Sequence, residues 1–337
     1  MSTSVLVTGG NGFVAGWCIV ELLSRGFHVR TTLRDRGREP RLRSALVRSG
    51  LDQAALANLS VVEADLLRDD GWDVAVNGCT YVLHVASPLG IRGGGDDDYL
   101  GPARDGTLRV LRFACGAGVQ RVVMTSAAAA ARPPLGATTT MSDETVWADA
   151  SEKRFDAYRR SKIVAERAAW DFMKGKTTEL TTVLPTAVFG PVLSRDNLGS
   201  VSIIENLLDG KPPAMPAFGF VIVDVRDLAK AHVDAMLEPA AGGERFLVGG
   251  EFVWFKELAA ALRSAAGGRG ERVPTRTLPT VVVKLLSPFV PKLRSLVGEV
   301  GRRNEVNSSK ARRVLGFEPR TLAETLADTV KSLDDVK

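Results

Sequence analysis

Short runs of apolar and β-branched residues alternate with amphipathic stretches along the first half of the chain. The runs predicted as strands are residues 4–8, 28–33, 59–64, 80–85, 121–126 and 180–184. The stretches predicted as helices include residues 14–25, 106–117 and 153–174. Strands separated by helices pair in parallel through right-handed crossovers. The pattern therefore predicts an α/β fold with a doubly wound parallel sheet of the Rossmann type.

The pattern becomes less regular after Pro185, where prolines interrupt it. A strand at residues 220–223 and a helix at residues 226–237 are expected to rejoin the first lobe. This reading predicts a main domain at residues 1–187, with residues 221–249 rejoining it. Residues 188–220 and 250–337 would form a smaller C-terminal substrate lobe over the carboxyl ends of the strands, where ligands of open α/β sheets bind. The Gly-Gly-Gly-Asp-Asp-Asp run at residues 93–98 is predicted as a solvated loop.

Composition and charge exclude several classes of protein. The net charge of +5 is mild and comes with no long basic block, so we expect no nucleic-acid binding. The most apolar late stretch, residues 281–300, contains lysines, an arginine and two prolines, so we expect no membrane span there. We expect an amphipathic helix pair there instead.

The N-terminus leads directly into a strand, without the basic and apolar segments of a signal peptide. The three cysteines, Cys18, Cys79 and Cys115, are far apart and lack the spacing of a zinc site. The sequence therefore predicts a cytoplasmic protein with reduced cysteines and no metal.

A glycine-rich turn joins the first predicted strand to the first predicted helix. The segment at residues 5–17 reads VLVTGGNGFVAGW, and Gly9 and Gly12 lie where the strand turns into the helix that Phe13 and Val14 begin. Glycine at these positions lets the backbone approach a pyrophosphate, and the helix N-terminus supplies amide donors. In this strand–turn–helix context, the motif predicts a dinucleotide site.

The end of the second strand indicates which dinucleotide binds. Enzymes that use NAD place a carboxylate there to accept the ribose 2′-hydroxyl, whereas Arg34 follows Leu33 in this chain. A guanidinium can bind two oxygens of a 2′-phosphate, so we expect NADP(H). Asp35 is the feature that favours NAD, and Arg36 and Arg38 are interpreted as part of a solvated basic loop.

Other residues at strand ends are expected to contact the cofactor. Asp65 is placed to reach the adenine edge, and small side chains after the fourth strand would let the cofactor lie close. The remaining expected contacts are Leu66, Val85, Ala86, Ser87, Thr125, Pro185 and Val188.

A tyrosine and a lysine stand one helical turn apart after the fifth strand. Tyr158 and Lys162 point to the same face of the predicted helix. A phenol can donate a proton to a carbonyl oxygen as hydride arrives, and the ammonium is expected to lower the phenol's pKa and to bind the nicotinamide ribose. A hydroxyl at the end of the fifth strand should polarise the substrate, and Ser126 is the candidate, with Thr125 in reserve.

Together these residues resemble the extended short-chain dehydrogenase/reductase family, in the branch of dihydroflavonol 4-reductase-like and yeast-type methylglyoxal/aldehyde reductases. The resemblance also rests on the motifs HVASP, RVVMTS, DETVW, YRRSK, LPTAVFGP and VDVRDLAKAH. It implies a Rossmann lobe with a small C-terminal lobe, the cofactor NADPH, and small aldehydes, ketones, keto esters or flavonoid-like ketones as substrates.

The sequence departs from the family pattern at the catalytic serine. The family reads Thr-Ser-Ser after the fifth strand and uses the second serine, which aligns with Ala127 here. Ser126 matches the first serine, whose side chain in a strand should point to the opposite face. Three outcomes are open: a local bulge turns Ser126 back, Thr125 or water replaces the donor, or the enzyme is slow.

The leading hypothesis is an NADPH-dependent carbonyl reductase, with Tyr158, Lys162 and Ser126 as its catalytic residues. One alternative is a hydroxysteroid dehydrogenase or a nucleotide-sugar-modifying enzyme, although the latter would prefer an acid in place of Leu33. The other alternative, which Ala127 motivates, is a non-catalytic NADP-binding sensor. We expect a monomer or a homodimer whose partner is a small-molecule carbonyl, with no membrane contact.

Overall fold

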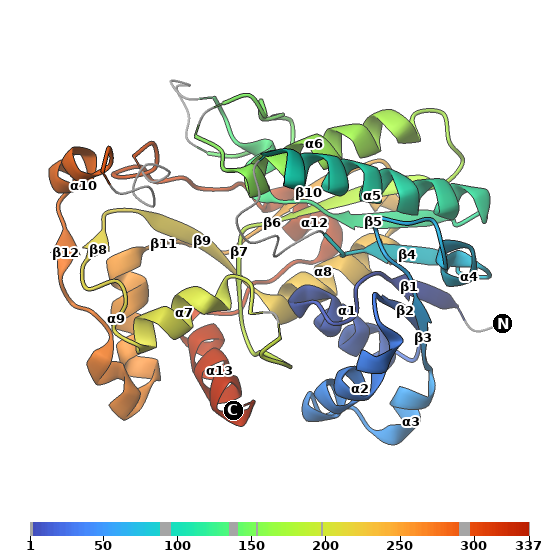
Figure 1. The fold of residues 1–337 in the computed structure, drawn as a ribbon, viewed down its shortest axis with the longest axis horizontal. Coiled ribbons are helices and arrows are strands. Elements are labelled where there is room, and N and C mark those ends of the chain that lie inside the picture. The colour runs from blue at the N-terminus through green and yellow to red at the C-terminus, as the bar shows by residue number, and fades with distance from the viewer. Residues whose placement is uncertain are drawn as a thin grey trace.

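The computed structural model of the protein describes residues 3–87, 96–134, 141–152, 154–196, 198–289 and 297–336. Its centre is a seven-stranded parallel sheet with the strand order β10-β6-β5-β4-β1-β2-β3 (Figure 1). The strands are β1 (Ser4–Val7), β2 (His28–Leu33), β3 (Leu59–Glu63), β4 (Tyr81–His84), β5 (Arg121–Thr125), β6 (Glu179–Pro185) and β10 (Arg245–Val248). The order reverses between β1 and β4, and this switch point is where such sheets bind ligands. The predicted Rossmann-type sheet is confirmed.

Two helical layers cover the sheet because successive strand residues point to opposite faces. Val5 and Val7 of β1 pack with the helices α1 (Phe13–Ser24) and α8 (Val225–Leu237). Leu6, between those two valines, packs on the other face with α5 (Asp96–Gly116) and α6 (Ala157–Met173). In Figure 1, α5 and α6 lie above the sheet, and α1 and α8 lie below it.

Two of these helices begin elsewhere than predicted. α5 begins at Asp96, so the aspartates at 96–98 belong to the helix and not to a loop, while the glycines at 93–95 lie outside the described residues. α6 was expected from residue 153, which also lies outside the described residues. It begins at Ala157, because the Asp156 side chain caps it and accepts a hydrogen bond of 2.8 Å from the Arg159 amide.

A smaller lobe packs beside the carboxyl ends of the main strands, at the left of Figure 1. It holds a three-stranded sheet in the order β11-β9-β7 and a two-stranded sheet of β12 and β8. The strands are β7 (Ala187–Phe189), β8 (Met215–Pro216), β9 (Gly219–Asp224), β11 (Phe252–Trp254) and β12 (Thr277–Leu278). The helices α7 (Val201–Leu208), α9 (Phe255–Ala265) and α13 (Leu322–Asp335) pack with them around a separate apolar core.

The strand expected at residues 220–223 does not join the main sheet, although Val223 packs in the core of the main lobe. It forms β9, which pairs with β7 and β11 of the small sheet. The strand that extends the main sheet is β10, which pairs in parallel with β6. The helix expected at 226–237, α8, does pack against α1 of the main lobe. The bounds of the two domains stay a prediction.

Several shorter elements complete the described chain. They are α2 (Glu39–Arg48), α3 (Gln53–Ala57), α4 (Trp72–Val76), α10 (Thr280–Leu286), α12 (Ser309–Leu315), and the 3₁₀ turns η1 (Arg36–Arg38), η2 (Ala128–Ala131), η3 (Pro239–Ala241) and η4 (Gly267–Arg272). Within the described residues, no helix combines the length and the apolar character that crossing a membrane requires. One helix of the pair expected at 281–300 is α10, and residues 290–296 lie outside the described part.

Candidate active site

A cavity of about 1080 Å³ runs along the carboxyl ends of the central strands and continues under the small lobe. All the cofactor and catalytic residues that the sequence predicts line it. These are Gly9, Gly12, Phe13, Val14, Arg34, Asp65, Leu66, Val85, Ala86, Ser87, Thr125, Ser126, Tyr158, Lys162, Pro185 and Val188. The fold therefore gathers residues from seven separate segments around one space, while their individual roles stay predictions.

The glycine turn has the backbone geometry that a pyrophosphate site needs. Gly9 has a φ of +73°, and a Cβ there would lie 2.9 Å from the Cβ of Ala86. The Thr8 hydroxyl oxygen accepts hydrogen bonds of 3.1 and 2.9 Å from the amides of Val85 and Ala86, which holds the two loops together. Gly12 caps α1 without a side chain, so the first-turn amides of α1 have no side-chain acceptor. This cradle fits a dinucleotide phosphate.

Arg34 and Asp35 differ in whether their charged groups already have a partner in the protein. Arg34 lines it and makes no ion pair within the described part of the chain. Asp35 also lines it, but its Oδ1 accepts a hydrogen bond of 2.8 Å from the Gly37 amide and caps η1. Its carboxylate is thus partly engaged in its own turn, which weakens the one feature that favoured NAD.

Sequence reasoning missed a second arginine near Arg34. Arg38 was interpreted as part of a solvated loop, yet it lines the cavity. It stands just before α2, so its place depends on how the loop folds through η1. Arg36 matches the solvated interpretation, since its side chain is highly exposed and lies 3.9 Å from Glu39.

Lys162 is buried at the floor of the cavity. Its Nζ donates a hydrogen bond of 3.2 Å to the carbonyl oxygen of Thr125, at the end of β5. Burial lowers the pKa of Lys162 to about 8, while the nearby Glu166 carboxylate opposes this shift. The ammonium is therefore fixed in position and still charged at neutral pH.

The side chain of Tyr158 lines the cavity, one helical turn before Lys162. The side chain is 39% exposed there, and its hydroxyl has no hydrogen-bond partner among the described residues. Burial of the ring against its neighbours and the Asp156 carboxylate raise the pKa of Tyr158, and Arg159 opposes them. The expected lowering of this pKa by Lys162 is therefore not found. Tyr158 holds its proton at neutral pH.

The Thr125 hydroxyl is engaged by a buried histidine. The Nδ1 of His232 lies 2.8 Å from the Leu228 carbonyl oxygen, so Nδ1 carries the proton and Nε2 is an acceptor. Burial lowers the pKa of His232 to about 4, which keeps the ring neutral. The Thr125 hydroxyl lies 2.7 Å from Nε2 and donates its proton there. Thr125 therefore has no proton left for a substrate oxygen.

Ser126 is also engaged away from a substrate. Its hydroxyl donates a hydrogen bond of 2.7 Å to Oε2 of Glu166, a fully buried carboxylate on α6. The hydroxyl of Thr182 and the guanidinium of Arg245 bind Oε1 of Glu166 at 2.7 and 3.0 Å. No bulge turns the Ser126 hydroxyl to a free position, so its role as the polarising donor stays a prediction that these contacts do not support.

The end of the cavity beyond Tyr158 is built by both lobes. Two aromatic residues of the small lobe, Phe218 and Phe220, line it. Sequence reasoning missed its polar residues, which are Arg132, Ser142, Arg159, Glu299 and Asn304. Most of them lie in segments without a regular pattern, so no periodic signal marks them.

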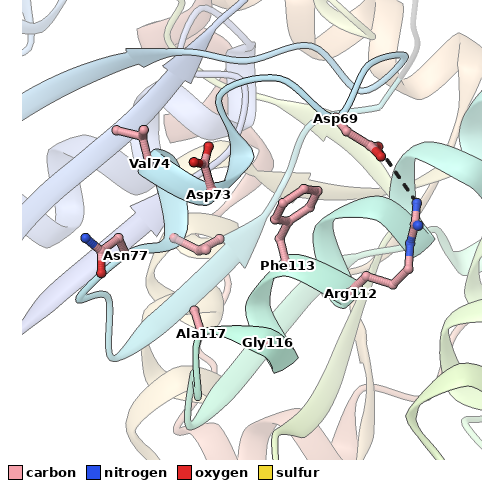
Figure 2. Close-up of a pocket in the computed structure, with 9 residues that line it drawn as sticks. Asp69, Asp73, Val74, Asn77, Arg112, Phe113, Gly116 and Ala117 are labelled. Atoms are coloured by element: carbon pink, nitrogen blue, oxygen red, sulfur yellow. Dashed lines mark ion pairs between the residues drawn. The ribbon is translucent and has the colours of Figure 1, made fainter.

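A second concavity lies on the outer surface, between α4 and α5, with a volume of about 540 Å³ (Figure 2). Asp73 and Val74 of α4 and Phe113 of α5 line it, and the ion pair between Asp69 and Arg112 lies at one end. None of the residues predicted to act in catalysis or cofactor binding lines it, so the site lies in the larger cavity.

Comparison with known proteins places the chain in a family. Residues 5–249 match the model of the NAD dependent epimerase/dehydratase family. The chain belongs to this family. The predicted membership of the extended short-chain dehydrogenases/reductases is thereby confirmed.

The relatives and solved structures that follow cover between 83% and 99% of the chain. Tetraketide alpha-pyrone reductase 1 of Arabidopsis thaliana is 33% identical over 83% of this chain and 84% of its own length. Cinnamoyl-CoA reductase CAD2 of Medicago truncatula is 33% identical over 99% of this chain and 96% of its own length. The Candida albicans Gre2 structure in complex with NADPH has a TM-score of 0.80 and 26% identity, and covers 99% of each chain. The yeast methylglyoxal/isovaleraldehyde reductase Gre2, also complexed with NADPH, has a TM-score of 0.77 and 25% identity, and covers 99% of this chain and 98% of its own.

Proposed function

We propose that the protein is an NADPH-dependent oxidoreductase that reduces a small aldehyde or ketone to the alcohol. One observation carries the proposal. Tyr158, which keeps its proton at neutral pH, opens on the cavity one turn before Lys162, whose ammonium the Thr125 carbonyl fixes. The glycine cradle and Arg34 at the other end of the same cavity support the cofactor, as do the two NADPH complexes of relatives.

Four side chains have separate roles in the proposed reaction. When bound, NADPH supplies the hydride. The Tyr158 hydroxyl then donates its proton to the carbonyl oxygen, which gains negative charge as the hydride arrives. Arg159 is the described charge that lowers the pKa of Tyr158 and so stabilises the phenolate left behind, whereas no effect of Lys162 on that pKa is found. Lys162 would hold the nicotinamide ribose with its charged ammonium, and Arg34 would bind the 2′-phosphate.

The site has one polarising donor fewer than the family pattern implies. The hydroxyls of Thr125 and Ser126 both donate their protons to buried side chains, and Ala127 has no hydroxyl. Losing one donor of this type typically costs roughly 10² to 10³ in rate. We therefore propose a slow enzyme in which Tyr158 alone polarises the carbonyl, working in the cytoplasm as a monomer or a homodimer.

The occupied hydroxyls also favour a second candidate, a non-catalytic NADPH sensor. The two functions differ in turnover. The test follows NADPH consumption by the purified protein over a panel of aldehydes, diketones, keto esters and flavanonols, with NADH in parallel. Turnover with NADPH well above NADH supports the reductase. NADPH binding in calorimetry without turnover on the whole panel contradicts it and supports the sensor.

A further inference from the structure

Two arginines from different segments line the cavity at its substrate end. Arg132 follows η2, and Arg159 follows Tyr158 in the first turn of α6. Both act on one acidic residue, because the charges of Arg132 and Arg159 help to lower the pKa of Glu299. Arg132 and Arg159 line the same cavity as Tyr158 and Glu299.

Arg132 is anchored through only one of its nitrogens. Its Nη1 donates to both carboxylate oxygens of Glu299, at 2.6 and 2.7 Å, and Asn304 donates to the same carboxylate at 2.8 Å. The other two nitrogens of Arg132, Nε and Nη2, have no hydrogen-bond partner among the described residues. Glu299 thus positions Arg132 while leaving donors free for a ligand.

Arg159 is held even more loosely. Its guanidinium makes one ion pair in the described part of the chain, with Asp156 at 3.5 Å, and the two side chains are 38% and 48% exposed. An exposed pair at this distance contributes little to stability. Arg159 lines the cavity, whereas Asp156 does not. The Arg159 guanidinium can therefore leave its weak ion pair and bind a ligand in the cavity.

Of the acidic groups near this space, Glu299 offsets the charge of Arg132, which leaves Arg159 as the more weakly paired cation. Arg154 is paired with Glu152 at 3.0 Å, and the Glu299 carboxylate is already bound by Arg132 and Asn304. Asp196 lines another part of the cavity, three residues before Gly199, which approaches Phe13 at the start of α1. The donors left at the substrate end therefore include cationic ones, from Arg132 and Arg159, beside the Tyr158 hydroxyl.

From this arrangement we propose that the pocket takes carbonyl compounds that carry a carboxylate, which Arg159 and Arg132 bind while the carbonyl oxygen lies at Tyr158. The planar fork of a guanidinium matches a carboxylate in two parallel hydrogen bonds. Phe218 and Phe220 supply an apolar wall for the carbon skeleton between the two groups. This inference names a substrate class and rests on the proposed reductase function.

The kinetic test compares two substrates that differ in one charge: 4-carboxybenzaldehyde and methyl 4-formylbenzoate. The wild-type protein should have a kcat/KM for the acid roughly tenfold or more above that for the ester. Arg159→Gln and Arg132→Gln should each lower the acid-to-ester ratio roughly 10- to 100-fold, through the KM of the acid. Lys174→Gln removes an equal charge from the exposed end of α6 and should leave the ratio unchanged.

A binding experiment separates this inference from the reductase function. Benzoate is titrated by calorimetry into the wild-type protein and the Arg159→Gln variant, both with NADP⁺ present. Benzoate binding that weakens at least about tenfold in the variant supports the inference even if neither aldehyde is reduced. Reduction of the ester at least as well as the acid, or benzoate binding that Arg159→Gln does not change, overturns it. Because Arg159 is partly exposed, its variant should fold even if Arg132→Gln does not.

Discussion

The hydroxyl of Ser126 donates a hydrogen bond of 2.7 Å to the completely buried carboxylate of Glu166. Ser126→Ala would leave this carboxylate short of a donor, at a cost of about 1–3 kcal/mol in the free energy of unfolding. We expect kcat of the folded variant to stay within about threefold of wild type, because the hydroxyl does not reach a substrate. Urea denaturation and steady-state kinetics measure both effects.

The matched control for Ser126 is Thr182→Val. Thr182 donates to the other oxygen of the same carboxylate, at 2.7 Å, and does not line the cavity. The two variants should lose similar stability. A loss of 100-fold or more in kcat for Ser126→Ala, with stability unchanged, would make Ser126 the polarising donor and contradict this assignment.

Ala127 is the position where a hydroxyl should improve the enzyme. Its side chain lines the cavity next to Ser126, and the family resemblance places the catalytic serine there. Ala127→Ser should raise kcat at least about tenfold, because it restores a donor to the carbonyl oxygen. Ala128→Ser, which also adds a hydroxyl to the cavity wall, serves as the control. Equal kcat values for both variants and wild type would show that the site lacks no donor.

Local patterns in the sequence were sufficient for the sheet and for most of the cavity. The glycine turn and the pair Tyr158 and Lys162 follow from spacing within one segment, and the structure brings them to one space. Contacts between distant segments were not predictable. The partner of Ser126 stands 40 residues away in sequence. The sequence of β9 predicts a strand, but it does not indicate which of the two sheets the strand joins.

The pKa of Tyr158 shows a similar limit. Helical spacing placed Lys162 nearby and suggested a lowered pKa, but the shift depends on burial and on Asp156 at the helix cap. Arg132 and Arg159 were not predicted, because Arg132 lies in a loop and the helical spacing of α6 marked only Tyr158 and Lys162.

Arg34 should determine the preference for NADPH over NADH. Arg34→Gln removes the guanidinium that we propose binds the 2′-phosphate, so KM for NADPH should rise roughly 10- to 100-fold while KM for NADH changes little. Arg36→Gln is the control, since Arg36 stands two residues on and does not line the cavity. An unchanged ratio of kcat/KM for the two cofactors in Arg34→Gln would remove Arg34 from the phosphate site.

The activity should fall at alkaline pH because of Lys162. Its pKa is lowered by burial to about 8, so the ammonium is present below this pH and lost above it. The kcat/KM for the carbonyl substrate should therefore decline as pH rises through about 8. Lys162→Arg keeps its charge at any pH in the range, so its lower activity should show no such decline. A wild-type profile that stays flat to pH 9 would contradict a role for the charged Lys162.

Two buried histidines should make the fold sensitive to acid. Burial lowers the pKa of His84 to about 3 and that of His232 to about 4, well below the value of about 6.5 in the unfolded chain. Between these values the unfolded state binds the extra protons, so stability is full above about pH 6.5 and is lost as pH falls toward 4. Each histidine should cost about 2 kcal/mol between pH 7 and pH 5.

The acid sensitivity is measured by urea denaturation at pH 7 and pH 5. His232→Asn should reduce the pH-dependent loss of stability by about 2 kcal/mol, whereas His28→Asn, at an exposed position, should keep it. Equal losses in the two variants would show that His232 titrates normally in the folded protein.

In the proposed NADPH-dependent reduction, Tyr158 donates the proton to the carbonyl oxygen. The most direct measurement is NADPH consumption by Tyr158→Phe on the best substrate of the wild-type protein, with NADPH binding measured by calorimetry. Tyr81→Phe, which removes a hydroxyl outside the cavity, is the control. We predict that Tyr158→Phe binds NADPH but loses roughly 10²- to 10⁴-fold in kcat, while Tyr81→Phe stays near wild type. Full turnover by Tyr158→Phe would show that Tyr158 is not the proton donor.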